Sequence, residues 1–94
     1  MIKFIEKYPI IIDKEFQLDL PLGSEVLGLS LIIGCPFVWV LLSKEFLEEK
    51  RFFELFKTGE AIECGIGFER KYIGTFVFKQ EVNHLFERLI PKQL

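Results

Sequence analysis

The feature that most constrains the fold is an uncharged apolar stretch that occupies residues 26–43. Its length is close to the roughly 20 apolar residues that a membrane-spanning helix requires. Gly34-Cys35-Pro36 interrupts it near the middle, and Gly and Pro together indicate a turn. The flanking residues are mostly acidic, unlike the basic residues that anchor a membrane span. We therefore predict two buried strands, residues 26–33 and 37–42, joined by a turn, rather than a membrane helix.

Both predicted strands are apolar on both faces. The second strand has one row of Phe37, Trp39 and Leu41 and an opposite row of Val38, Val40 and Leu42. An antiparallel strand normally exposes one face to water, so another layer or another subunit is expected to cover the second face. The chain has 94 residues, of which 50% are hydrophobic, and this length predicts a single domain over residues 1–94. We therefore predict a homo-oligomer.

The rest of the sequence predicts an all-β domain, because short segments rich in Ile, Val, Phe and Tyr alternate with Gly, Pro and acidic residues. Further strands are expected at residues 2–8, 16–20, 51–57 and 71–78, and loops at residues 43–50 and 60–70. Apolar residues after Glu81 recur at spacings of three and four, which indicates an amphipathic helix, with a final strand as the alternative. The predicted fold is a mostly antiparallel sandwich or barrel-like domain of six to seven strands, with a strand or a short helix at the C-terminus.

Charge and cysteine content exclude several functional classes. Twelve Lys and Arg against fourteen Asp and Glu give a net charge of −2, and the basic residues are scattered, so duplex nucleic acid is not an expected partner. Cys35 and Cys64 lie far apart without a second ligand near either, which predicts no zinc site and reduced, cytosolic thiols. The first ten residues mix charges with apolar residues, so we expect no secretory leader and a cytoplasmic protein. No cofactor is expected.

Six segments occur in an order that covers nearly the whole chain: KYPI at residues 7–10, LPLGSEVLGL at 20–29, GCPFVWVLL at 34–42, FELFKTGEAI at 53–62, KYIGTF at 71–76 and VNHLFE at 82–87. Together they resemble a family of short, uncharacterised proteins encoded mostly by phages, prophages and bacteria. The resemblance implies a compact β domain with a final strand, and it makes counter-defence a reasonable expectation. Asn83 departs from the family, which tends to carry an aromatic residue there. The resemblance transfers no catalytic residue.

No catalytic constellation is evident in the sequence. His84 has no Ser or Cys nucleophile near it in the sequence, and we interpret it as structural. Cys64 precedes Gly65-Ile66-Gly67, but the strand–Gly–helix context of a phosphate loop is missing, so this segment is interpreted as a flexible loop. Glu48 and Glu49 are adjacent and therefore diverge, unlike a glycosidase pair. We predict that the protein is not an enzyme.

The most functional-looking residues are Arg70, Lys71 and Tyr72, with Arg51 as a further candidate. Arginine offers a planar fork for phosphate or carboxylate, and tyrosine offers a stacking face, so together they suit nucleotide-like ligands. The alternative interpretation is a solvated strand end beside a core tyrosine. We expect Arg51 and Arg70 to lie at strand ends in water.

Three functional hypotheses follow from these features. The leading one is a non-enzymatic phage or prophage counter-defence protein that sequesters a small anionic, nucleotide-like host signal at a subunit interface. The competing hypothesis is an inhibitor that binds a host or defence protein through an exposed aromatic face. The third is a minor structural phage protein. The acidic composition, with a pI near 5.4, slightly favours a protein partner over an anion.

Overall fold

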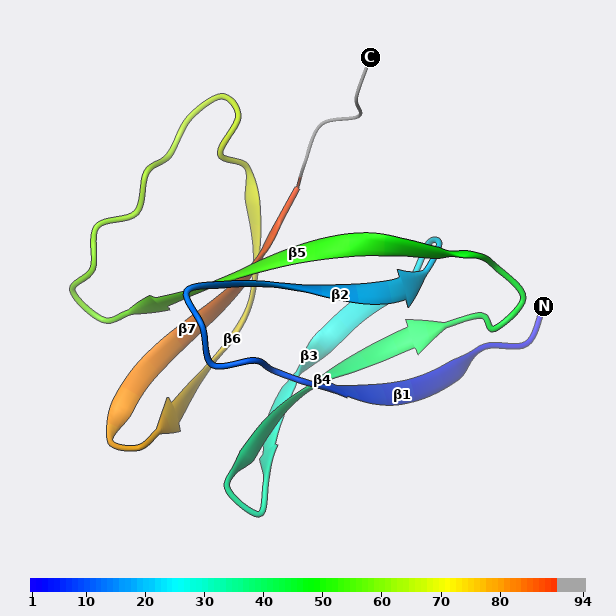
Figure 1. Cartoon of the computed structure of the whole chain (residues 1–94), viewed down its shortest axis with the longest axis horizontal. Helices are drawn as coiled ribbons and strands as arrows, with labels where there is room; N and C mark the ends of the chain where they lie inside the picture. The colour runs from blue at the N-terminus through cyan, green and yellow to red at the C-terminus, as the bar shows by residue number, and fades with distance from the viewer. Residues whose placement is uncertain (90–94) are drawn as a thin grey trace.

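The computed structural model describes residues 1–89, which form seven strands in two antiparallel sheets. The strands are β1 (Phe4–Pro9), β2 (Glu15–Pro21), β3 (Glu25–Ile32), β4 (Cys35–Leu42), β5 (Glu48–Lys57), β6 (Arg70–Phe78) and β7 (Glu81–Arg88). Sheet A has the strand order β1-β4-β3, and sheet B has the order β2-β5-β7-β6 (Figure 1). The predicted all-β, mostly antiparallel sandwich is therefore confirmed.

The uncharged stretch forms the hairpin β3–β4, as predicted, but the turn lies earlier than expected. Ile33 and Gly34 are the turn residues, with φ values of 50° and 76°, the left-handed conformation that two-residue hairpin turns require. Cys35 and Pro36 already belong to β4. Glycine therefore supplies the turn here, whereas Pro36 is tolerated near the start of a strand.

The boundaries of several other elements differ from the sequence predictions. β5 begins at Glu48, within the segment expected to be a loop, and β1 ends at Pro9 rather than before it. Residues 58–69 form the predicted long loop, and Arg70 is the first residue of β6. The extra residues of β5 pair with the end of β2, where Leu20 is fully buried, so tertiary pairing extends the strand through a charged sequence.

The C-terminal segment 81–88 is a strand, and the helix interpretation is wrong for these residues. β7 lies between β5 and β6 and pairs with both. Asn83, Leu85 and Glu87 are buried, which is the period-two burial of a strand in a sheet. The sequence of this segment thus contains two patterns: the period of two typical of a strand and the spacing of three and four typical of a helix. The strand forms because β7 pairs with β5 on one side and β6 on the other. Ile90, the last residue of the predicted helix, lies outside the described residues.

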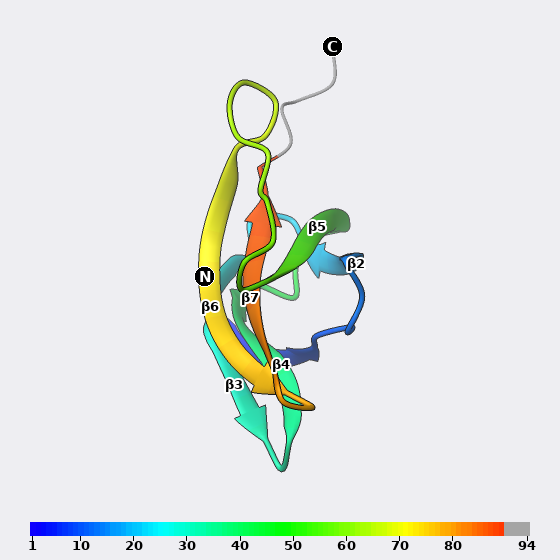
Figure 2. The same ribbon diagram turned by 90° about the vertical axis from the view of Figure 1, so that its left-hand side faces the viewer.

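The core lies between the two sheets. It contains a stacked pair, Phe16 and Phe53, with ring centroids 5.2 Å apart, together with Leu20, Val26, Val38, Val40, Leu42, Leu55, Phe76 and Leu85. At one edge β3 approaches β6 so closely that a Cβ atom on Gly74 would lie 2.8 Å from Leu29 Cγ. Figure 2 shows the β3–β4 hairpin at one end of the molecule and the loop 58–69 at the other. We call the face of each sheet that points away from this core its outer face.

Candidate functional site

Arg51, a predicted ligand residue, is held by the protein itself. Its Nε and Nη2 donate hydrogen bonds to the Glu87 carboxylate, the latter over 3.1 Å, and its Nη1 donates to the Ser24 carbonyl over 2.8 Å. The Glu49 carboxylate lies 3.6 Å from the same Nη1. The hydrogen bond to Glu87 raises the pKa of Arg51. Only 18% of the Arg51 side chain is exposed, so it lies on the inner face of sheet B and fastens β5 to β7 and to the β2–β3 connection.

Arg70, the second predicted arginine, is also engaged internally. Its Nε donates to Glu54 over 2.6 Å, and its Nη1 donates to the carbonyls of Glu63 and Phe68 over 2.6 and 3.1 Å. The hydrogen bond to Glu54 raises the pKa of Arg70. The side chain is 8% exposed. The expectation that Arg51 and Arg70 lie in water is therefore wrong, because each has a carboxylate partner on a neighbouring strand.

Arg88 completes this cluster and was not singled out from the sequence. Its Nη1 lies 3.6 Å from Glu54, its Nη2 donates to the Gly67 carbonyl over 2.7 Å, and its buried Nε has no hydrogen-bond partner in residues 1–89. The guanidinium groups of Arg70 and Arg88 lie 5.9 and 5.4 Å from the Phe68 ring centroid. The two arginines therefore clamp the loop 58–69 onto the outer face of sheet B. The signal in the sequence was Glu54, a charged residue inside an apolar segment.

Lys71 and Tyr72 are exposed, but they do not join the two arginines in one site. The Tyr72 ring packs edge-to-face on Phe86 at 5.4 Å, and 55% of the residue is exposed, so it is a surface residue and not part of the core. Adjacent residues of a strand point to opposite faces, and the partners of Arg51 and Arg70 follow this rule: Glu87 lies on the inner face and Glu54 on the outer face of sheet B. The four predicted residues are thus divided between two faces.

His84 belongs to a surface network of hydroxyl groups. Its Nε2 lies 2.8 Å from the Thr58 hydroxyl and its Nδ1 lies 2.9 Å from the Thr75 hydroxyl, which also contacts the Tyr72 hydroxyl. Both ring nitrogens therefore have a partner. The network ties the start of the loop 58–69 to β6 and β7, which is consistent with the structural interpretation of His84.

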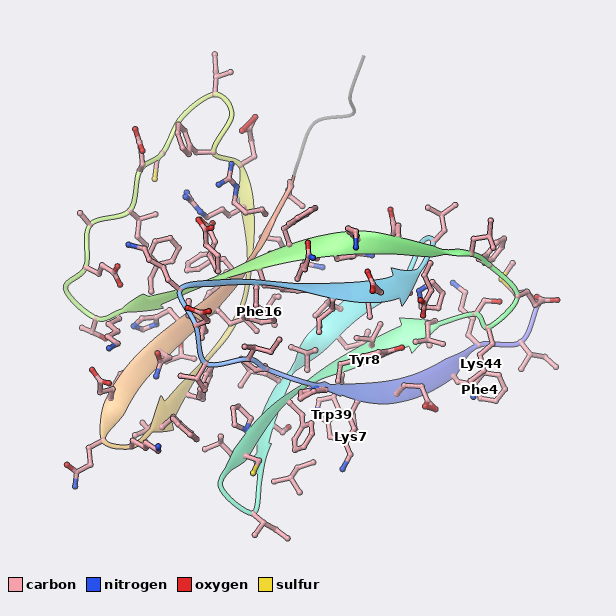
Figure 3. The ribbon with its side chains drawn as sticks, viewed as in Figure 1. Phe4, Lys7, Tyr8, Phe16, Trp39 and Lys44 are labelled. Carbon is pink, nitrogen blue, oxygen red and sulfur yellow. The ribbon has the colours of Figure 1, made fainter. Side chains whose placement is uncertain are left out.

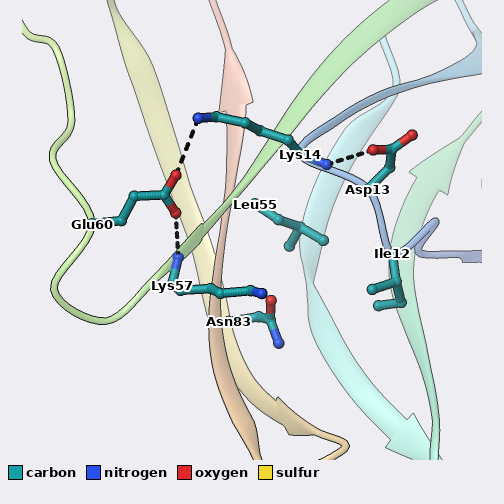
Figure 4. Close-up of a pocket in the computed structure, with 7 residues that line it drawn as sticks. All are labelled: Ile12, Asp13, Lys14, Leu55, Lys57, Glu60 and Asn83. Carbon is teal, nitrogen blue, oxygen red and sulfur yellow. Dashed lines mark hydrogen bonds and ion pairs between the residues drawn. The ribbon is translucent and has the colours of Figure 1, made fainter.

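A pocket of about 450 Å³ opens where the β1–β2 connection meets sheet B (Figure 4). Lys14 Nζ lies 3.1 Å from Glu60, and the backbone N–H of Lys57 donates to the same carboxylate over 2.9 Å. The Lys57 N–H and the Lys14 ammonium hold the pKa of Glu60 below its usual range. Lys57 Nζ in turn lies 2.8 Å from Glu81. The charges at the pocket thus neutralise one another, and both ammonium groups already have a carboxylate partner.

The outer face of sheet A has a different character. The register of the three strands places one set of side chains on it: Ile5, Lys7, Glu25, Ile32, Phe37, Trp39 and Leu41. Figure 3 shows Lys7 and Trp39 pointing away from β2 and β5, whereas Tyr8 points toward them. Ile5 is 60% exposed, and no strand of residues 1–89 lies over this face. The Trp39 indole donates to the Ser30 hydroxyl over 2.9 Å, so its polar N–H is satisfied and the ring surface is left for apolar contact.

Other kinds of site find no support in residues 1–89. No three side chains of His, Cys, Asp or Glu come together there in a way that could hold a metal ion. Cys35 and Cys64 are free and exposed. The described part of the chain also has no helix that is long and apolar enough to cross a membrane.

The fold is that of a small two-sheet antiparallel β domain. The chain belongs to a domain family of unknown function, DUF7352, whose model matches residues 1–93. No curated protein and no solved structure matches the chain. Membership of an uncharacterised family is thus confirmed, while a phage origin stays a prediction.

Proposed function

We propose that this protein is a non-enzymatic binding protein that engages another protein through the outer face of sheet A. The observation that carries the proposal is the row Phe37, Trp39 and Leu41 with Ile5 beside it, which no other strand of residues 1–89 covers. Contiguous apolar surface on a small domain commonly marks a site of protein association. Aromatic residues such as Trp39 are also those that contribute most to protein interfaces.

The contacts of the two arginines favour this function over sequestration of an anion. Arg51 and Arg70 each donate to a carboxylate and to a backbone carbonyl. A nucleotide phosphate would have to displace these partners, which would leave the buried Glu87 without its counter-ion or the buried Glu54 with Arg88 alone, and either change is costly. The protein-binding hypothesis requires no such rearrangement.

The setting of the proposal comes from the resemblance to phage and prophage proteins. In that setting the protein acts in the bacterial cytoplasm, and the partner is a host or defence protein whose activity it inhibits. The net charge of −2 is compatible with such a partner and gives no general attraction for nucleic acid.

Site-specific photo-crosslinking in bacterial cells tests the proposal. A photoreactive phenylalanine analogue at Ile5 should form an adduct with a bacterial protein, because Ile5 borders the aromatic row. The same analogue at Gln17, an exposed residue of β2 on sheet B, is the matched control and should form none. Trp39→Asp, added to the protein that carries the analogue at position 5, should abolish the adduct, because it places a charge in the centre of the face.

Two results would overturn the proposal. One is an absence of foreign adducts at position 5, or equal yields from positions 5 and 17. The other is calorimetric titration with cyclic or ADP-ribose-derived nucleotides that gives a micromolar dissociation constant, weakened at least tenfold by Arg70→Ala. The second result would restore the sequestration hypothesis.

A further inference from the structure

The two charged side chains on the outer face of sheet A lie on opposite sides of the aromatic row. Lys7 on β1 is opposite Trp39, and Glu25 on β3 is opposite Leu41. Both residues are exposed, and neither takes part in an ion pair within residues 1–89. By contrast, Lys50 on β5 of sheet B pairs with Asp19 of the same chain. The Lys7 ammonium lies 4.6 Å from the Phe37 ring centroid, so the face offers one cation and one anion that each lack an oppositely charged partner within residues 1–89.

Their placement suits a two-fold axis. β4 is the central strand, so the midpoint between Lys7 and Glu25 falls on β4 between Trp39 and Leu41. A two-fold axis that lies in the plane of the interface, passes through this midpoint and is perpendicular to the line from Lys7 to Glu25 exchanges the two charged positions. Each Lys7 then meets Glu25 of the other copy, and the apolar row meets its own symmetry mate. Such a self-complementary patch is what a two-fold dimer interface requires.

We infer that a second copy of this chain covers the outer face of sheet A in a face-to-face, two-fold dimer with two Lys7–Glu25 ion pairs. This inference rests on the proposed function, because it takes the same face as a protein-binding surface. In this arrangement the second copy shields the face until the host partner replaces it.

The size of the face sets the strength of the dimer. Three strands about 4.8 Å apart and about 20 Å long present roughly 300 Å² per copy in projection, which is well below the roughly 800 Å² per partner of a standard specific interface. The dimer is therefore weak, with a dissociation constant in the micromolar range or above. The charges then act mainly by selecting the relative orientation of the two copies. An orientation that brings the Lys7 side chains of both copies together is unfavourable, because like charges repel.

Charge-reversal variants test the inference. Their dissociation constants are measured by sedimentation velocity of the purified proteins in low salt, at about 1 to 500 µM, a range that brackets the expected affinity. Lys7→Glu and Glu25→Lys should each raise the dissociation constant about tenfold or more, since each creates two like-charge contacts per dimer. The double variant should return to within about threefold of the unmodified protein, because the pairs are restored in reverse. Lys71→Glu and Glu15→Lys, exposed residues of sheet B, are matched controls and should have no effect.

Several outcomes would overturn the inference. They are a monomer at all concentrations, a dimer whose affinity neither reversal changes, and a double variant as weak as the single ones. Circular dichroism confirms that each exposed variant is folded. The test is independent of the proposed function: a monomer that still forms foreign adducts from position 5 refutes the dimer alone. A dimer with the expected reversals but without foreign adducts refutes the host partner alone.

Discussion

The outer faces of the two sheets are covered to different degrees. On sheet B, Arg70 and Arg88 pair with Glu54 and hold the loop 58–69 against the sheet, and Phe56, whose ring lies 5.2 Å from the Arg70 guanidinium, is 5% exposed. On sheet A, the row around Trp39 is half-buried, the Lys7 ammonium lies 4.6 Å from the Phe37 ring centroid, and no strand of residues 1–89 lies over the row. Within residues 1–89 the long loop 58–69 is held against part of the outer face of sheet B, where Tyr72 and Val77 stay exposed, and no strand of these residues lies over the outer face of sheet A.

The difference shows which surface residues point to an interaction. Arginines near a surface suggest an anion site, but here the carboxylates of the same domain already occupy them. The apolar residues of sheet A carry the stronger signal, because no strand of residues 1–89 lies over their outer side. A ligand or partner is best sought where the structure leaves interactions unsatisfied rather than where charge is dense.

The largest expected effect comes from breaking the clamp on sheet B. Glu54→Ala removes the carboxylate shared by Arg70 and Arg88 and leaves a buried guanidinium without a counter-ion. The free energy of unfolding should fall by about 3–5 kcal/mol, measured by urea denaturation. Glu15→Ala is the control, because Glu15 lies opposite Glu54 on β2 but is exposed and unpaired in residues 1–89. It should change stability by less than about 0.5 kcal/mol. Equal effects of the two substitutions would show that the clamp is not what closes this face.

A smaller change in stability is expected from replacing two strand glycines, Gly74 between the sheets and Gly28 on the outer side of sheet A. Gly74→Ala places a methyl group against Leu29 at the junction of β3 and β6, and should destabilise the fold by about 1–3 kcal/mol through overpacking. Gly28→Ala is the matched control, because Gly28 also adjoins a bulge but has open space around it. It should be neutral or stabilising by up to about 1 kcal/mol, since alanine restricts the unfolded chain. Thermal denaturation of both variants measures the difference, and a destabilised Gly28→Ala would contradict the open face.

Much of the fold could be predicted from the sequence, because hydrophobic period and turn residues are local signals. The interruption at Gly34 divided the uncharged stretch correctly into two strands. The β6–β7 hairpin carried no such signal: its turn residues Lys79 and Gln80 adopt φ values of 50° and 66° without glycine or asparagine. The last strand was ambiguous for a similar reason. Its neighbours β5 and β6 fix it by pairing on both sides, and that information is non-local.

The candidate site was harder to predict than the fold. Arg51 and Arg70 have their partners on other strands, at Glu87 and Glu54, and a sequence does not show which carboxylate lies opposite which arginine. The uncovered apolar strand, by contrast, could be anticipated. The row Phe37, Trp39 and Leu41 was expected to be covered by another layer or another subunit. It is only half-buried in the structure, because no strand of residues 1–89 covers it.

The smallest effect on folding is expected on sheet A, with the substitution Ile5→Thr. Most of this side chain is already in water, and threonine suits a strand, so the free energy of unfolding should change by less than about 0.5 kcal/mol at low protein concentration. At high concentration the dimer stabilises the folded state by mass action, so the melting temperature of the unmodified protein should rise with concentration. Ile5→Thr should weaken that rise, while Val77→Thr, at a similarly exposed position of sheet B, should preserve it. Differential scanning calorimetry over a hundredfold range of concentration measures both. A loss of more than about 2 kcal/mol at the lowest concentration would place Ile5 among the residues that hold the monomer together. The outer face of sheet A would then be part of the fold and not a surface kept for a partner.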